Sequence, residues 1–264
     1  MAFNIVVTAK QVVDPETPLS AFAIEDNTVS TIGQSPVVNG FDEQAVEAAL
    51  RIKDSAQDVH VTIISLGNDF ALDVIKKPLA MGADALILLQ DDAFGNSIDP
   101  SRTVAALTAA IEKIGDVDLV LSGRQASDWD NAQVPAGIAE NLGWPLATIA
   151  KRVEIDGRNV RVERVLPDGH EVVEADLPAV ITVSNELGTA RYPNMRGIMA
   201  ARKVQPTVWG LEDLGLNVAD IAPAFELLSL SKPERNVQTE MINGDDDQDA
   251  GRKLAQALRD ARLV

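Results

Sequence analysis

The sequence of 264 residues contains no cysteine and only two histidines, His60 and His170. Without cysteine the chain forms no disulfide, no thiolate metal site and no cysteine nucleophile. Two histidines leave little material for a histidine-rich metal site or for a Ser-His-Asp triad. We therefore expect no bound metal and no catalytic residue, and the composition favours a binding or carrier role.

Basic residues are also scarce, with 23 against 40 acidic ones, which gives a formal net charge of -17. A field of this sign repels nucleic acid and anionic membranes. No apolar run has the length needed to cross a bilayer, and the start of the chain lacks the pattern of a signal peptide. We expect a cytoplasmic protein with no membrane insertion and no nucleic-acid partner.

Apolar runs of strand length alternate with helical patterns through the first half of the chain. Four runs are typical of buried strands: 3–9, 59–66, 85–89 and 119–121. Three helical patterns lie between them: 43–53, 69–81 and 101–114. Asp42 and Asp99 stand where they can begin the first and third helices, and Pro78 is expected to break the second. This order predicts an α/β fold with a doubly wound, mainly parallel, Rossmann-like sheet.

The pattern changes in the second half, where short strands follow one another directly. They are expected at 147–155, 160–166, 171–175 and 179–183. Turn pairs separate the first three of them, so these strands should be antiparallel additions to the sheet. A weaker hairpin pattern covers 21–33. Near the end, the acidic break 243–248 precedes a helical pattern over 249–263. We predict an α/β domain over 1–204 and an extended C-terminal arm over 205–264.

The stretch 119–145 has the order strand, small-residue turn, polar loop and helix. Joints of this kind place backbone N–H groups against phosphate in α/β sheets. Arg124 adds a cation near the turn, and Asp128, Asp130 and Asn131 can cap the following helix. Neither a Walker-type lysine signature nor a GxGxxG motif occurs. An ordinary structural joint explains the pattern equally well.

The segment 185–203 has neither strand nor helix periodicity, but it concentrates basic residues in an acidic protein. Arg191, Arg196, Arg202 and Lys203 lie here beside the apolar Tyr192 and Met195. Apolar anchors within a basic loop suit the recognition of a protein partner. The alternative is a long crossing loop with ordinary surface charges.

Six blocks of sequence together match one known family. They are 6–11 (VVTAKQ), 39–47 (NGFDEQAVE), 80–84 (AMGAD), 123–145, 177–183 (LPAVITV) and 191–203. Their order and spacing are specific, and the chain resembles the β subunit of electron transfer flavoproteins over essentially its full length. The universal-stress type of nucleotide-binding module remains an alternative for the α/β portion alone.

The resemblance implies a heterodimer with an α subunit that holds most of the redox FAD. Such proteins accept electrons from flavin-dependent dehydrogenases and pass them to a quinone oxidoreductase or another acceptor. The family's β subunit is an adenine-nucleotide-binding domain that usually holds AMP with a structural role. In electron-bifurcating relatives the same site holds a second FAD, which exchanges hydride with NAD. AMP is the first expectation because it is the commoner state, although the order Asp128-x-Asp130-x-Ala132-Gln133-Val134 looks more like bifurcating members.

The resemblance also assigns residues to roles. The implied nucleotide contacts lie in four segments: Thr8, then Asn39, Gly40, Phe41 and Asp42, then Leu66, and finally Gly123, Arg124, Ala126, Ser127, Asp128, Asp130, Asn131, Ala132, Gln133 and Val134. The segment 185–203 resembles the family's recognition loop for partner dehydrogenases. Its implied contacts are Arg191, Tyr192, Met195, Arg196, Ile198 and Met199.

Four positions depart from the family pattern. Gly40 stands where the family often has proline, which loosens the turn before Phe41. Pro135 stands where glycine is usual, and its missing N–H argues against a phosphate contact there. Trp129 occupies a place where a small or acidic residue is expected, and its indole can cover a ring or a partner surface. Pro167 replaces an acidic residue in the strand-turn segment 164–171, which weakens the family signature without breaking it.

Overall fold

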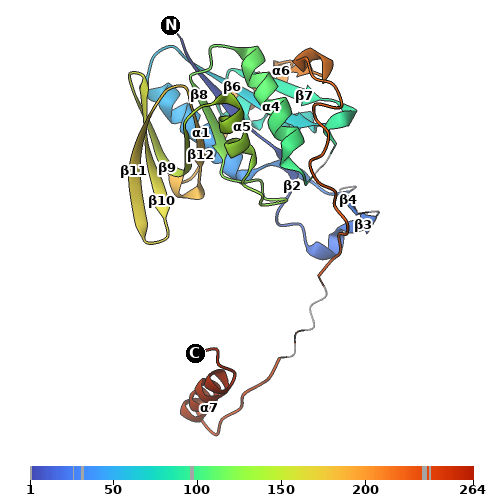
Figure 1. The fold of residues 1–264 in the computed structure, drawn as a ribbon. Helices are drawn as coiled ribbons and strands as arrows, with labels where there is room; N and C mark the ends of the chain where they lie inside the picture. The colour runs from blue at the N-terminus through green and yellow to red at the C-terminus, as the bar shows by residue number, and fades with distance from the viewer. Residues whose placement is uncertain (1, 26, 31–32, 96–97, 234–236, 238) are drawn as a thin grey trace. The chain divides into compact units, whose positions relative to one another are not determined.

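The computed structural model describes all residues except 1, 26, 31–32, 96–97, 234–236 and 238. The chain forms two compact units, residues 1–230 and 231–264 (Figure 1). Among the described residues, no helix has both the length and the apolar character needed to span a bilayer.

A nine-stranded sheet forms the centre of the first unit, in the order β11-β10-β9-β12-β8-β1-β6-β7-β13. The parallel strands are β1 (Phe3–Thr8), β6 (Val59–Gly67), β7 (Ala85–Gln90), β8 (Leu119–Gly123), β12 (Ala179–Val183) and β13 (Thr207–Trp209). β1 pairs with β6 on one side and with β8 on the other. After β1 the chain adds β6 and β7 on one side, and it then crosses back to add β8 and β12 on the other side. The predicted doubly wound, mainly parallel sheet is confirmed.

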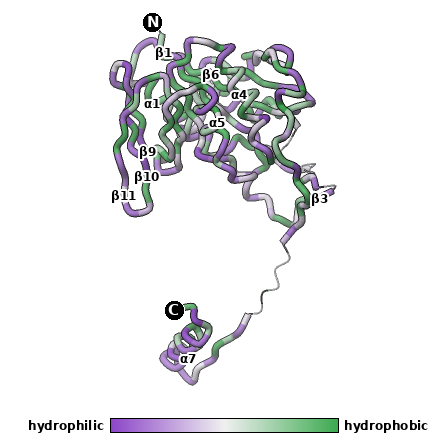
Figure 2. Tube along the Cα trace, viewed as in Figure 1, coloured by the Kyte–Doolittle hydropathy of each residue, from purple (hydrophilic) through white to green (hydrophobic). Residues whose placement is uncertain are grey.

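Helices cover both faces of this sheet, and β1 shows how the sequence divides between them. Ile5 and Val7 belong to the core on the side of α1 (Gly40–Ser55), whereas Val6 belongs to the core on the side of α4 (Pro100–Ile114) and α5 (Val134–Leu142). Successive side chains of a strand point to opposite faces, so both must be apolar when both faces are covered. This explains the continuous apolar runs of the central strands (Figure 2).

Three strands that pair antiparallel with one another extend the sheet at one edge. They are β9 (Leu146–Asp156), β10 (Asn159–Leu166) and β11 (Gly169–Asp176). β10 pairs antiparallel with both neighbours, and β9 pairs parallel with β12. The predicted antiparallel pairing among these three strands is confirmed, but β9 itself joins the sheet parallel to β12. Ion pairs such as Lys151–Glu163, at 3.0 Å, join side chains across these strands.

Near the N-terminus, β3 (Ala23–Glu25) and β4 (Thr28–Ser30) form the predicted hairpin, although 26 and 31–32 lie outside the described residues. A second antiparallel pair, β2 (Gln11–Val13) with β5 (Pro36–Val38), was not predicted. This pair matters for the site because it returns the chain from β1 to the start of α1.

Helix boundaries follow the local signals in part. The Asp99 carboxylate accepts from the Ser101 N–H at 2.9 Å and begins α4 as predicted. The second predicted helix is broken, into α2 (Leu72–Ile75) and α3 (Lys77–Met81), close to Pro78. The segment that lacked a clear period contains a helix, α6 (Met195–Lys203), whose Asn194 side chain accepts from the Gly197 N–H at 2.8 Å.

The stretch after α6 stays with the sheet. β13 pairs with β7, and Leu211 and Ile221 are buried in the core on the α4 side. The first compact unit therefore reaches Leu230, while the expected functional boundary at 204/205 stays a prediction.

The second unit contains α7 (Asp247–Asp260), which Asp246 begins by accepting from the Asp249 N–H at 2.8 Å. No described residue of α7 is buried within the chain.

Candidate functional site

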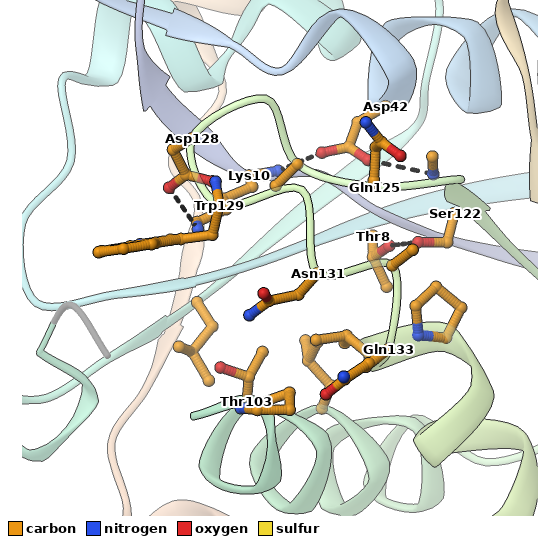
Figure 3. Close-up of a pocket in the computed structure, with 18 of the residues that line it drawn as sticks. Thr8, Lys10, Asp42, Thr103, Ser122, Gln125, Asp128, Trp129, Asn131 and Gln133 are labelled. Atoms are coloured by element: carbon orange, nitrogen blue, oxygen red, sulfur yellow. Dashed lines mark hydrogen bonds and ion pairs between the residues drawn. The ribbon is translucent and has the colours of Figure 1, made fainter. Parts of the chain in front are cut away.

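A pocket of about 130 Å³ opens at the carboxyl ends of β1, β6 and β8 (Figure 3). β1 lies between β6, which follows it in the chain, and β8, to which the chain returns later. In open α/β sheets, ligands bind in the crevice at such a switch point. The pocket thus lies at the strand ends where the sequence predicted a ligand, and the ligand itself stays a prediction.

Two hydroxyl groups lie together at the strand ends. Thr8 Oγ1 donates to Ser122 Oγ at 2.7 Å, and both residues are buried. Asn131, Thr103 and Gln133 approach the same space from α4 and from the loop before α5 (Figure 3). These hydroxyl and amide groups can donate to and accept from the hydroxyls or phosphate of a nucleotide.

The carboxylate of Asp42 links a residue just beyond the end of β1 with the last residue of β8. It accepts from the Lys10 N–H at 2.8 Å and from the Gly123 N–H at 3.1 Å. Burial raises the pKa of Asp42 to about 7, and the hydrogen bonds from these N–H groups and from Asn39 offset only part of that rise. Asp42 does not begin the helix as predicted, because α1 begins at Gly40 and Asp42 lies in its first turn.

Asn39 precedes α1 and is fully buried. Its side chain makes no cap hydrogen bond to the helix. Instead, its Nδ2 donates to the Gln125 carbonyl at 2.8 Å, and its Oδ1 accepts from the Ser127 N–H at 3.2 Å. Asn39 therefore attaches the loop after β8 to the start of α1.

The loop acids do not cap the next helix, so that prediction was wrong. α5 has Gln133 at its N-cap position, and no side chain caps it. Asp128 Oδ2 lies 2.6 Å from Lys10 Nζ, and Asp130 Oδ1 accepts from Gln125 Nε2 at 2.7 Å. Asn131 Nδ2 donates to the Ile98 carbonyl at 2.9 Å. All three side chains therefore have partners elsewhere, which a single stretch of sequence does not show.

The chemistry of the pocket fits an adenine nucleotide. Gln133 and Val134 line it at the start of α5, and the first N–H groups of a helix have no partner within the helix. Such a helix end favours a phosphate. Pro135 lies in this first turn and supplies no N–H, so the remaining donors of the turn carry that role. Ile64 and Leu66 add an apolar wall suited to a ring system.

Most, but not all, of the predicted nucleotide residues meet at this pocket. Those that line it are Thr8, Asp42, Leu66, Gly123, Ala126, Asp128, Asn131, Ala132, Gln133 and Val134. Those that do not line it are Asn39, Gly40, Phe41, Arg124, Ser127 and Asp130. The guanidinium of Arg124 lies over the Phe41 ring, 5.2 Å from its centroid. The Ser127 hydroxyl is buried and has no hydrogen-bond partner among the described residues.

Sequence reasoning missed the contribution of α4. Pro100, Thr103 and Leu107 line the pocket from this helix, and Ile98 lines it from just before. The available signal was the parallel sheet itself, since the helix after β7 begins at the same edge as the ends of β1 and β8. Gln125 and Ser122 also line the pocket, and both lie inside the stretch 119–145.

The segment around α6 presents apolar side chains to solvent. Tyr192 is 88% exposed, Met195 74% and Met199 50%. Arg191 is not a free cation. Its Nε lies 2.8 Å from Glu47 Oε2, and its Nη2 lies 2.8 Å from Asp54 Oδ2. It therefore attaches the segment to α1.

Comparison with known proteins agrees with this geometry. The model of the electron transfer flavoprotein domain matches residues 27–214. The caffeyl-CoA reductase-Etf complex subunit CarD of Acetobacterium woodii is 36% identical over 265 residues, covering 99% of this chain and 100% of that protein.

Two electron transfer flavoprotein β subunits are also similar. That of Megasphaera elsdenii is 40% identical over 206 residues, covering 76% of this chain and 75% of the relative. That of Mycobacterium tuberculosis H37Rv is 34% identical over 269 residues, covering 99% of each chain. These matches favour this family over a universal-stress type of module. From its fold, its pocket and these similarities together, the chain belongs to the electron transfer flavoprotein family, as a β subunit.

Proposed function

We propose that this chain forms a heterodimer with an electron transfer flavoprotein α subunit and holds a structural AMP in the switch-point pocket. The heterodimer carries electrons from flavin-dependent dehydrogenases to a quinone oxidoreductase or another acceptor. The observation that carries this proposal is the pocket itself, because ten residues implied by the family resemblance line it.

Each part of an adenine nucleotide has a matching part of the pocket. The first turn of α5 suits the phosphate, and the Thr8–Ser122 hydroxyl pair suits the ribose. The apolar side chains of Ile64 and Leu66 suit the base. AMP supplies no redox chemistry, and the FAD held mainly by the α subunit accepts and donates the electrons. The role of this chain is to hold its nucleotide and to present surfaces to its partners.

We assign partner recognition to the exposed residues of the α6 segment. Tyr192, Met195 and Met199 offer apolar contacts, and Arg196 and Ile198 lie within the same segment. Replacing Met195 by alanine should slow electron transfer from a partner dehydrogenase while FAD content stays intact. Val208→Ala, at an exposed apolar position on β13, is the matched control. Equal transfer rates in both variants would exclude Met195 as an anchor.

The C-terminal arm is the proposed contact with the α subunit. Leu254 is 48% exposed, and no residue of α7 is buried within the chain. An amphipathic helix normally buries its apolar face. Covering by the α subunit would satisfy that requirement.

A second candidate is an electron-bifurcating subunit, in which the same pocket holds a second FAD that NADH reduces. One observation favours it. One of the relatives that match over essentially the full length of both chains is named as a subunit of a caffeyl-CoA reductase-Etf complex. The order of residues from Asp128 to Val134 points the same way.

Counting bound nucleotides tests both candidates. The chain is co-expressed with its α subunit, the purified heterodimer is denatured, and released FAD and AMP are quantified per heterodimer. One FAD with one AMP supports the electron carrier with a structural nucleotide. Two FAD and no AMP support the bifurcating subunit. One FAD with no second nucleotide would reject both assignments of the pocket.

A further inference from the structure

Lys10 stands at a fixed point beside the pocket. Its N–H donates to Asp42 Oδ2 at 2.8 Å, and its carbonyl accepts from the Asn39 N–H at 2.9 Å. Both of these partners are buried. Because the main chain is held from two sides just beyond β1, the point from which the lysine side chain extends is fixed.

The loop between β8 and α5 is attached near each end. The Ser127 N–H donates to Asn39 Oδ1 at 3.2 Å, and Asn131 Nδ2 donates to the Ile98 carbonyl at 2.9 Å. The neighbouring Ala132 has a φ of 53°, a left-handed conformation that residues with a Cβ atom disfavour. The middle of the loop lies between these two attachments, and the Asp130 N–H donates to the Ala126 carbonyl within it at 2.9 Å.

Asp128 lies in the middle of this loop, and Lys10 contacts it from just beyond the end of β1. Lys10 Nζ lies 2.6 Å from Asp128 Oδ2, with the two side chains 38% and 23% exposed. Both residues line the pocket, next to Trp129 (Figure 3). We infer that the Lys10–Asp128 ion pair is a latch that holds this loop over a bound nucleotide and slows its release. The inference rests on the proposed function, in which the pocket binds an adenine nucleotide.

The competing role for Lys10 is direct binding of the phosphate. Among the described residues that line the pocket, Lys10 is the one cationic side chain. If it binds phosphate, Asp128 competes for it, and removing the Asp128 charge should strengthen nucleotide retention. If the ion pair is a latch, removing that charge weakens retention. The two roles therefore predict opposite signs for one substitution.

The test uses the heterodimer with the α subunit and the variants Asp128→Asn, Lys10→Gln and their combination. Free nucleotide is removed by gel filtration, and the AMP or second FAD that remains bound is quantified at intervals. For a partly exposed ion pair we expect release about 1.5- to fivefold faster in each single variant. The double variant should release no faster than either single one, because both changes break the same contact.

Three further measurements separate a latch from a general loss of structure. Asp128→Glu keeps the charge and should keep release slow. High salt should speed release from the wild type but not from the variants, because it screens the ion pair. Lys53→Gln is the matched control: Lys53 pairs with Asp84 at 2.6 Å, their side chains are 28% and 31% exposed, and neither lines the pocket. This control should release nucleotide at the wild-type rate.

The outcomes that overturn the latch are distinct from those that overturn the nucleotide site. Slower or unchanged release from Asp128→Asn, with faster release from Lys10→Gln, would make Lys10 a phosphate ligand. Wild-type release rates in all variants would remove the ion pair from any role in retention. A wild-type heterodimer without a second nucleotide would overturn the proposed site itself.

Discussion

Raising the pH from about 4 to 7 should remove about 3 kcal/mol of the stability that Asp42 contributes. Burial raises the pKa of Asp42 to about 7 in the folded chain, from an ordinary value of 3.8. A group whose pKa is raised by folding stabilises the folded state fully below its unfolded pKa. That contribution is then lost as the pH rises through the folded pKa, because a buried carboxylate must ionise.

The assay compares urea unfolding of the nucleotide-free wild type with that of Asp42→Asn at several pH values. Trp144 and Trp209 pack against the core on the α4 side and report unfolding by fluorescence. The difference between the two chains is the relevant quantity. Carboxylates with lowered pKa, such as those of Glu47 and Asp99, stabilise the folded state with the opposite pH dependence. Both chains contain these carboxylates, so their contributions cancel in the stability difference between wild type and Asp42→Asn.

Asparagine has the shape of the protonated side chain and never ionises. The stability difference should therefore shift by about 3 kcal/mol in favour of Asp42→Asn between about pH 4 and pH 7. A difference that stays constant over this range would show that Asp42 is solvated in the folded chain and ionises at its ordinary pKa.

Two glycine positions give further predictions. A Cβ at Gly123 would lie 2.4 Å from Asp42 Oδ1, so Gly123→Ala should lower the free energy of unfolding in urea by about 2–4 kcal/mol. The control is Gly40→Ala, because nothing lies within 4 Å of the new Cβ there. Equal stabilities of the two variants would contradict the close packing at Gly123. A Cβ at Gly197 would lie 2.3 Å from the Ala80 carbonyl oxygen, so Gly197→Ala should displace α6. Electron transfer from a partner dehydrogenase should then be severalfold slower, with unchanged FAD content. Transfer at the wild-type rate would show that it does not depend on the position of α6.

The parallel sheet could be predicted because its signals are local. Each central strand is apolar on both faces, and α4 begins after Asp99, the residue predicted to start this helix. α6 was missed because its apolar residues include Met195 and Met199, which are exposed. A helix whose apolar side chains face solvent among basic residues does not show the stripe that marks a buried face.

The location of the site was predictable, but the partners of its side chains were not. The sequence order places the loop 124–133 after a central strand, which is enough to put it at the switch point. Lys10 and Asp128, however, lie 118 positions apart, and Arg191 and Glu47 lie 144 apart. Single-sequence patterns carry no information about such pairs. Asp128 was therefore interpreted as a helix cap, and the ion pair of Arg191 with Glu47 was not predicted.

Helix α1 is a rigid spacer between the pocket and the α6 segment. Its 16 residues span roughly 24 Å. Its first turn holds the ends of β1 and β8 through Asp42, and Glu47 on its second turn holds the α6 segment through Arg191. One residue inserted between Asp42 and Glu47 would rotate the second contact by about 100° around the axis and away from Arg191. The five-residue step from Asp42 to Glu47, roughly 7.5 Å along the helix axis, thus sets the position of the α6 segment relative to the pocket.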